Sequence, residues 1–149
     1  MTTYGIIKFL HVVSVAFWLG GITLSTFFLR DAMMEKQIDQ MNHTFERVQH
    51  WNLVMFVPAS FVVLLTGITM LMQLDGSKTF WVLVKERFGS LFIILFIAFV
   101  VFYGRSALAK MRIKSSENGI NFRILKYYTI FLNISIICMA FLIFVVTVK

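Results

Sequence analysis

The chain has 149 residues, of which 59% are hydrophobic and only 14% are charged. A soluble domain normally has about 25% charged residues, so this composition excludes an ordinary soluble protein and indicates a chain surrounded by lipid. The net charge of +7 does not indicate nucleic-acid binding, because no soluble domain carries it. Attraction to anionic lipid headgroups explains the charge better, so we expect the lipid bilayer as a partner and no nucleic acid.

Four apolar segments are long enough to cross a bilayer, which takes about 20 helical residues. They cover about 4–29, 51–72, 80–108 and 126–148. We expect each to be an α-helix, because hydrocarbon offers backbone groups no hydrogen-bond partner. The first lacks a basic n-region and a cleavage site, so we expect it to be retained rather than removed as a signal peptide. Short connections predict an all-α, integral membrane, up-and-down four-helix bundle, a single domain over 1–149.

Basic residues are distributed unevenly between the two ends of this predicted bundle. The loops after the first and third spans hold nine of the 14 Lys and Arg residues, and the opposite side holds the other five. Basic residues accumulate on the cytoplasmic side of membrane proteins. We therefore expect both termini on the outer side.

A stripe of polar and small residues follows one face of the first span at steps of three and four. It consists of Lys8, His11, Ser14, Trp18, Gly21 and Ser25. We expect this face to point into the bundle, because lipid would penalise an imidazole and an ammonium group. Close helix packing explains the small residues. An ionisable group within a span marks a functional site by default, although His11 bonded to a neighbouring helix's hydroxyl or carbonyl remains an alternative.

The other spans give weaker signals. Pro58 predicts a kink in the second span, and Asn133 is expected to bond from the fourth span across to another helix. At the start of the third span, Lys85 is most simply an interfacial anchor. Nine methionines raise the question of copper, since soft thioethers select Cu(I). There is no Met-x-x-Met series or Cys-x-x-Cys pair, so methionine as a filler of apolar space is the default interpretation.

Three spacings occur in order along the chain. They are H-x6-W-x2-G from His11 through Trp18 to Gly21, P-x8-G from Pro58 to Gly67, and W-x3-K from Trp81 to Lys85. Together they resemble a superfamily of small bacterial four-helix membrane proteins. It includes the HemJ-type protoporphyrinogen oxidases, the membrane domain of copper-resistance D (CopD) proteins, and relatives of unassigned function, to which this chain is most similar.

The resemblance implies a b-type haem, a tetrapyrrole substrate or an electron-transfer partner, and functional importance for His11 and Lys85. It also implies a multi-pass protein of the bacterial cytoplasmic membrane. Some residues of the HemJ-type proteins are not matched. Tyr103 is followed by Gly104 rather than by histidine, and the fourth span lacks their Asn-Glu-x-Pro element. We therefore do not expect porphyrinogen oxidation, and whether the protein is an enzyme stays open.

The favoured hypothesis is a haem-binding membrane protein with His11 as axial ligand to the iron. Its redox activity and its second axial ligand stay open. One alternative is a copper-handling protein that uses His11 with Met70 or Met72. Another is a non-catalytic membrane subunit or scaffold, and a homo-oligomer is compatible with each hypothesis.

Antiparallel alternation brings the chemically distinctive residues of three spans to one predicted depth, in the outer third of the bundle. His11, Gly67, Met70 and Lys85 are expected there, with Lys85 paired to a haem propionate. Trp18 lies about 10 Å deeper on the face of His11 and is the predicted floor of the site. His50, at the far end of the second span, is expected to lie too far from His11 to share its iron.

Overall fold

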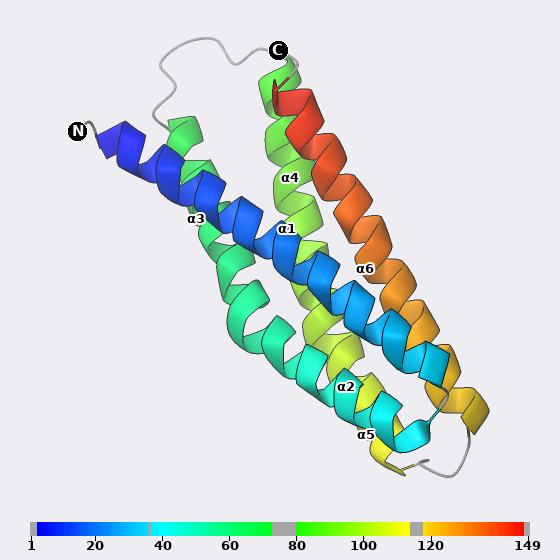
Figure 1. Ribbon diagram of the computed structural model, residues 1–149. Helices are drawn as coiled ribbons and strands as arrows, with labels where there is room; N and C mark the ends of the chain where they lie inside the picture. Colours follow the sequence, from blue (N-terminus) through cyan, green and yellow to red (C-terminus); the bar gives the residue numbers. More distant parts are fainter. Residues whose placement is uncertain (1–2, 36, 73–79, 114–117, 148–149) are drawn as a thin grey trace.

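The computed structural model describes residues 3–35, 37–72, 80–113 and 118–147. These form four long helices that run alternately up and down (Figure 1), so the predicted all-α four-helix bundle is confirmed. The first and last are uninterrupted: α1 spans Thr3–Glu35 and α6 spans Asn118–Thr147. The second joins α2 (Ile38–Trp51), η1 (Asn52–Phe56) and α3 (Val57–Met72), and the third joins α4 (Phe80–Ala98), η2 (Phe99–Tyr103) and α5 (Gly104–Ile113).

Each long helix contains a segment long and apolar enough to cross a membrane. These segments are Thr3–Met34, Ile38–Met72, Arg87–Ile113 and Asn121–Val145. Large apolar side chains stand exposed on their outer faces, including Phe9, Phe102 and Ile137. Such a surface is stable only against hydrocarbon, since water would penalise it. The outer face of the bundle is therefore its lipid-facing surface.

The stretch between the first two spans, treated in the sequence as a loop, is mostly helical. Its α2 helix buries Met41, Phe45 and Val48, which follow one another at steps of four and three. Polar residues occupy the opposite face, where Glu46 forms an ion pair with Arg112 of α5. Taken alone, α2 is too polar to be recognised in the sequence as a membrane span. Only the spacing of its apolar residues indicates a helix.

Two wide π-helical turns interrupt the second and third long helices. In η1 the amide N–H of Val57 donates to the carbonyl of Asn52, and in η2 that of Gly104 donates to the carbonyl of Phe99, five residues back in both cases. Pro58 has no N–H to donate, and its ring crowds the carbonyl four residues earlier. At the predicted kink of Pro58, the structure has a π-helical turn, and the helix continues beyond it to Met72.

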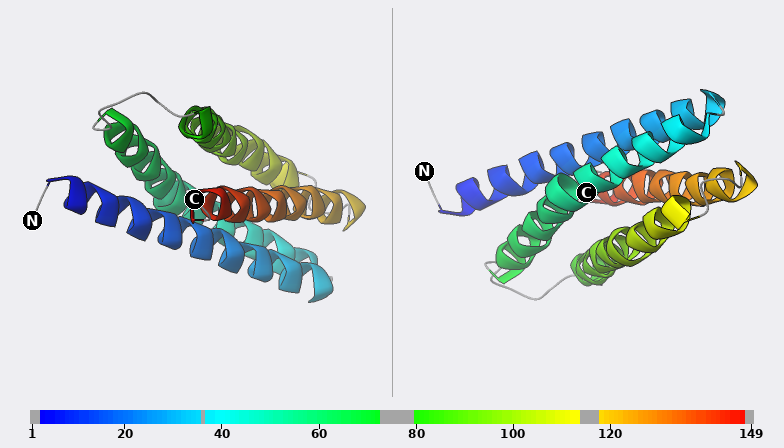
Figure 2. Two further views of the ribbon diagram at one scale, coloured as in Figure 1. Left: turned by 90° about the horizontal axis from the view of Figure 1, so that it is seen from above. Right: turned by 90° about the horizontal axis from the view of Figure 1, so that it is seen from below.

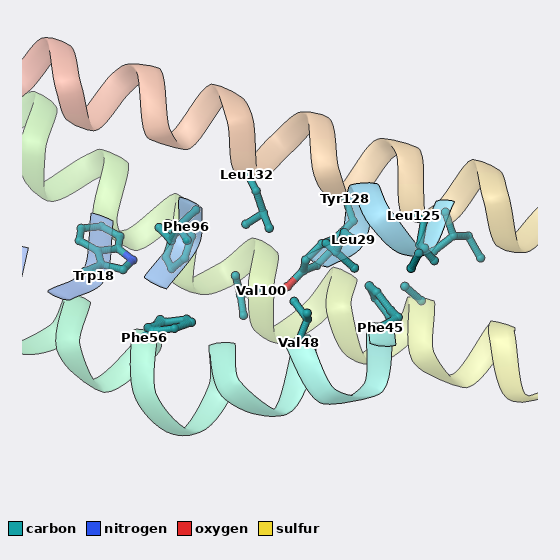
Figure 3. Packing of buried hydrophobic residues seen from close by; sticks show 14 of the residues in the cluster. Trp18, Leu29, Phe45, Val48, Phe56, Phe96, Val100, Leu125, Tyr128 and Leu132 are labelled. Carbon is teal, nitrogen blue, oxygen red and sulfur yellow. The ribbon is translucent and has the colours of Figure 1, made fainter. Parts of the chain in front are cut away.

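The four long helices surround a narrow core. α3 and α6 lie on either side of the space between α1 and α4 (Figure 2), and α1 packs against both α3 and α6. Trp18 of α1 is buried in this core, with its ring centroid 5.0 Å from that of Phe96 in α4. Figure 3 shows this pair at one end of the core and Tyr128 with Phe45 at the other.

The polar stripe of α1 mostly points inward, as the sequence analysis predicts. Trp18 and Ser25 are buried, and His11 is half-buried. Lys8, in contrast, is exposed, because α1 at this end has less of its surface covered by the other helices. An ammonium group near the end of a span can reach the headgroup layer, which removes the need for an inward position.

Gly21 allows α1 to approach η1 closely. A Cβ atom built on Gly21 would overlap the ring of Phe56, which is itself buried. The neighbouring Gly20 meets no atom within 4 Å at the same position. The two adjacent glycines thus have different roles, since only Gly21 is required for helix contact.

We predict that Gly21→Ala destabilises the protein by about 1–3 kcal/mol, because the added methyl group forces the Phe56 ring to move in a packed interface. Gly20→Ala is the matched control and should leave the free energy of unfolding within about 0.5 kcal/mol of the wild-type value. Thermal unfolding of both variants in detergent micelles measures the difference. Equal melting temperatures for the two variants would contradict the close approach at Gly21.

Candidate functional site

His11 of α1 and Thr66 of α3 are joined by a hydrogen bond across the helix interface. The Nδ1 atom of His11 lies 2.8 Å from the hydroxyl oxygen of Thr66. That hydroxyl lies 2.7 Å from the carbonyl oxygen of Val62, one turn earlier in α3. A threonine hydroxyl has one proton, so a hydroxyl that donates to the carbonyl of Val62 can only accept from His11. In that arrangement the imidazole would carry its proton on Nδ1.

This arrangement matches the requirements of a histidine that binds a metal. Such a histidine nearly always donates its second ring N–H to an acceptor, which fixes the tautomer and the orientation of the ring. Here the hydroxyl of Thr66 is that acceptor. The hydrogen bond to a neighbouring helix also agrees with the structural alternative of the sequence analysis. The geometry is therefore compatible with both interpretations of His11.

Gly67 lies directly beside His11. A Cβ atom at Gly67 would be 3.6 Å from the Cε1 atom of the imidazole, which is an ordinary van der Waals contact. Met70 follows one turn after Thr66 and is half-buried, whereas Met72 is 80% exposed. The structure therefore brings Gly67 to His11, places Met70 at the same end of α3, and leaves Met72 at the surface.

Trp18 lies seven residues further along α1, about 10 Å deeper in the bundle. Its side chain is 2% exposed and contacts Phe92 and Phe96 of α4, with ring centroids 6.1 and 5.0 Å away. Its indole Nε1 has no hydrogen-bond partner among the described residues. Trp18 thus closes the core below His11, at the depth where the sequence analysis places the floor of a site.

The side chain of Lys85 lies outside the described residues, so its predicted role stays a prediction. Its backbone belongs to α4, seven residues before Phe92. Trp18 contacts Phe92, so these two residues lie at about the same level of the bundle. His11 lies seven residues before Trp18, and residue 85 lies seven residues before Phe92. The backbone of α4 therefore reaches the level of His11 at about residue 85. α3 and α6 flank the space between these two backbones (Figure 2).

The other histidines lie far from His11. His50 is exposed on α2, sixteen residues before Thr66 in one continuous helix, which corresponds to about 24 Å. Two axial ligands of one haem lie just above and below the same ring, so His50 could not share an iron that His11 bound. The described residues contain no group of three or more His, Cys, Asp or Glu side chains that could hold a metal ion.

A second polar cluster lies in the core at the level of the two π-helical turns, and sequence analysis did not identify it. Asn52 donates to the hydroxyl of Tyr128 over 2.8 Å, and this hydroxyl donates to Gln49 Oε1 over 2.7 Å. Gln49 Nε2 donates in turn to the carbonyl of Val100 in η2, 2.8 Å away. All three polar side chains are buried, so the cluster joins the second, third and fourth long helices.

The predicted hydrogen bond from Asn133 to another helix is wrong. Asn133 is exposed and donates to the carbonyl of Thr129 in its own helix. The signal for the true cluster is the spacing of Gln49 and Asn52, which continue the buried face of Phe45. The carbonyl of Val100 has no sequence signal, because it depends on the π-helical turn η2.

The cluster gives a specific test of hydrogen bonding in the core. We predict that Tyr128→Phe lowers the free energy of unfolding by about 1–3 kcal/mol, because it leaves the buried groups of Gln49 and Asn52 without a partner. The neighbouring Tyr127 is 60% exposed, so Tyr127→Phe is the control, with a change within about 0.5 kcal/mol. Thermal unfolding in detergent measures both variants, and an unchanged melting temperature for Tyr128→Phe would refute the cluster.

Comparison with known proteins identifies the family of this chain. No curated protein and no solved structure matches the chain significantly. A family model described as "Predicted integral membrane protein (DUF2269)" matches residues 5–149, which include all four candidate spans except the first two residues of the first. The chain therefore belongs to the DUF2269 family of integral membrane proteins.

Proposed function

We propose that this integral membrane protein binds a b-type haem, with His11 as an axial ligand to the iron. The observation that carries the proposal is the hydrogen bond between His11 Nδ1 and the hydroxyl of Thr66, which itself bonds the carbonyl of Val62. A second-shell hydrogen bond of this kind orients an imidazole that binds iron through its other nitrogen. The imidazole is half-buried on the inner side of α1, and Gly67 removes a side chain beside it.

The number of protein ligands favours haem over copper. A porphyrin supplies four nitrogens to its iron, so one histidine from the protein is enough to hold it in place. A copper site needs several protein ligands, and Met70 is the only one of the two proposed methionines that is not strongly exposed. Copper bound by His11 and Met70 remains the second candidate because Met70 lies one turn beyond Thr66.

The three ordered spacings in the sequence support the haem proposal further. These spacings resemble the ones found in the HemJ-type and copper-resistance D proteins. The first spacing contains His11 and the second contains Gly67, and these two residues are neighbours in this structure. The resemblance suggests that Lys85 binds a haem propionate and that the membrane is the bacterial cytoplasmic membrane. The distribution of basic residues supports both termini outside, which puts His11 in the outer part of the bundle. A bound haem would supply one-electron redox chemistry, while this chain would position it and exclude water from its inner side.

We predict that protein purified from membranes has the Soret absorption of a b-type haem, and that His11→Ala abolishes it. Thr66→Val keeps the shape of the side chain but removes the acceptor for Nδ1, so it should weaken haem binding about 10- to 100-fold. His50→Ala is the matched control and should bind haem as the wild type does. Haem titration followed by absorption, with thermal unfolding as a check on folding, measures all four proteins.

The outcomes separate the three hypotheses. A Soret band that survives in folded His11→Ala would refute His11 as the ligand. Copper in the purified protein, with no haem, would favour the copper-handling alternative. A wild-type protein that binds neither haem nor copper would refute the proposal and leave a non-catalytic membrane subunit or scaffold.

A further inference from the structure

A groove with a volume of about 420 Å³ runs along the outside of the contact between α1 and the start of the second span. Its α1 side includes Phe17, Gly20 and Leu24, and its other side includes Trp51 and Met55. Gly20 contributes to its depth, because no atom lies within 4 Å of the position that a Cβ would take. The groove does not belong to the His11 site, since its residues begin five positions further along α1.

The groove opens onto the lipid-facing surface. Phe17, Leu24 and Met55 are each about half exposed and are continuous with the apolar outer face of the bundle. All three belong to candidate membrane spans, so hydrocarbon is the medium that meets the groove. An apolar chain of a membrane lipid would therefore fill it without losing contact with the bilayer.

The shape of the groove favours an acyl chain over a second helix. Phe17 and Leu24 lie three residues before and four residues after Gly20, so both stand on the same face of α1 as the glycine. A partner helix, about 10–12 Å across with its side chains, would reach Gly20 only by inserting one side chain between these two residues. A thin, flexible chain can lie between them, and the flexible side chain of Met55 can adjust to it.

Two opposite charges lie beyond one end of the groove. Asp31 follows Leu24 by seven residues on the groove side of α1, and Arg47 precedes Trp51 by four on α2. Trp51 lines the groove toward this end, and the ring of Phe28 packs against it, with ring centroids 5.7 Å apart. Both charged side chains are exposed. A guanidinium group binds a phosphate and a carboxylate binds an ammonium group, so the pair matches a headgroup that contains both.

We propose that this groove binds one aminophospholipid, with an acyl chain along Gly20, the phosphate at Arg47 and the primary amine at Asp31. Phosphatidylethanolamine has this chemistry. The proposal is independent of haem binding, because none of these residues contacts His11 or Thr66 in the hydrogen bonds that define that site.

The acyl-chain part of the proposal is tested by filling the groove. Native mass spectrometry of the full chain, released from nanodiscs of equal phosphatidylethanolamine and phosphatidylglycerol, counts the lipid that stays bound. Gly20→Leu should lower the bound lipid at least about tenfold, which corresponds to about 1.4 kcal/mol. Gly89→Leu is the matched control, because Gly89 in α4 also has open space at its Cβ position but lies outside the groove, and it should retain wild-type binding.

The headgroup part is tested by neutralising the charges. Arg47→Gln and Asp31→Asn should each remove the preference for phosphatidylethanolamine, whereas Arg105→Gln, at another exposed arginine, should keep it. Equal lipid binding by Gly20→Leu and Gly89→Leu would overturn the proposal. So would a wild-type dimer that Gly20→Leu converts to a monomer, because the groove would then be a helix interface. A wild-type preference for phosphatidylglycerol would overturn the assigned headgroup.

Discussion

The structure depends on one constraint: within a bilayer, a polar group is stabilised by a partner inside the protein. Several hydroxyl groups of the described spans satisfy it locally. Thr23, Thr26 and Ser135 each donate to the carbonyl four residues earlier in their own helix. Among the described residues, side chains also bond between helices at His11 with Thr66, at the buried cluster around Tyr128 and, over 3.4 Å, at Asn121 with Asn42. The first two sites have the shorter bonds and help to fix which faces of the helices meet.

The cross-helix sites at His11 and Tyr128 differ in what surrounds them. The cluster around Tyr128 lies in the closed part of the core, where π-helical turns of two neighbouring helices come together and the carbonyl of Val100 is bonded by Gln49. His11 lies on the other side of Trp18, toward the end of the bundle where α1 begins, and is only half-buried. A closed polar cluster supports the fold, while a half-buried imidazole that is oriented by a hydrogen bond suits a ligand. The structure thus separates a stabilising region from a candidate binding region along one bundle.

Sequence reasoning predicted the features that depend on long, simple patterns. Apolar runs gave the four helices, and steps of three and four gave the inward face that contains His11 and Trp18. It did not predict α2, whose polar surface hides the buried Met41 and Phe45 from a search for membrane spans. It also missed the bond to Val100, because a carbonyl exposed by a π-helical turn has no residue type of its own. The partner of His11 was left open, since several hydroxyls and carbonyls of the other spans were equally plausible from spacing alone.

The central claim is that Thr66 holds His11 in the tautomer with the proton on Nδ1. Nitrogen-15 NMR of histidine-labelled protein, prepared without added haem or metal, tests it directly, because the chain has three histidines. His43 and His50 are exposed and serve as references that exchange protons with water. The account predicts one imidazole with a protonated Nδ1 and an unprotonated Nε2, and this pattern should disappear in Thr66→Val. A His11 protonated on Nε2 instead would contradict the account, because Thr66 would then donate to Nδ1 and the lone pair would not be on Nε2.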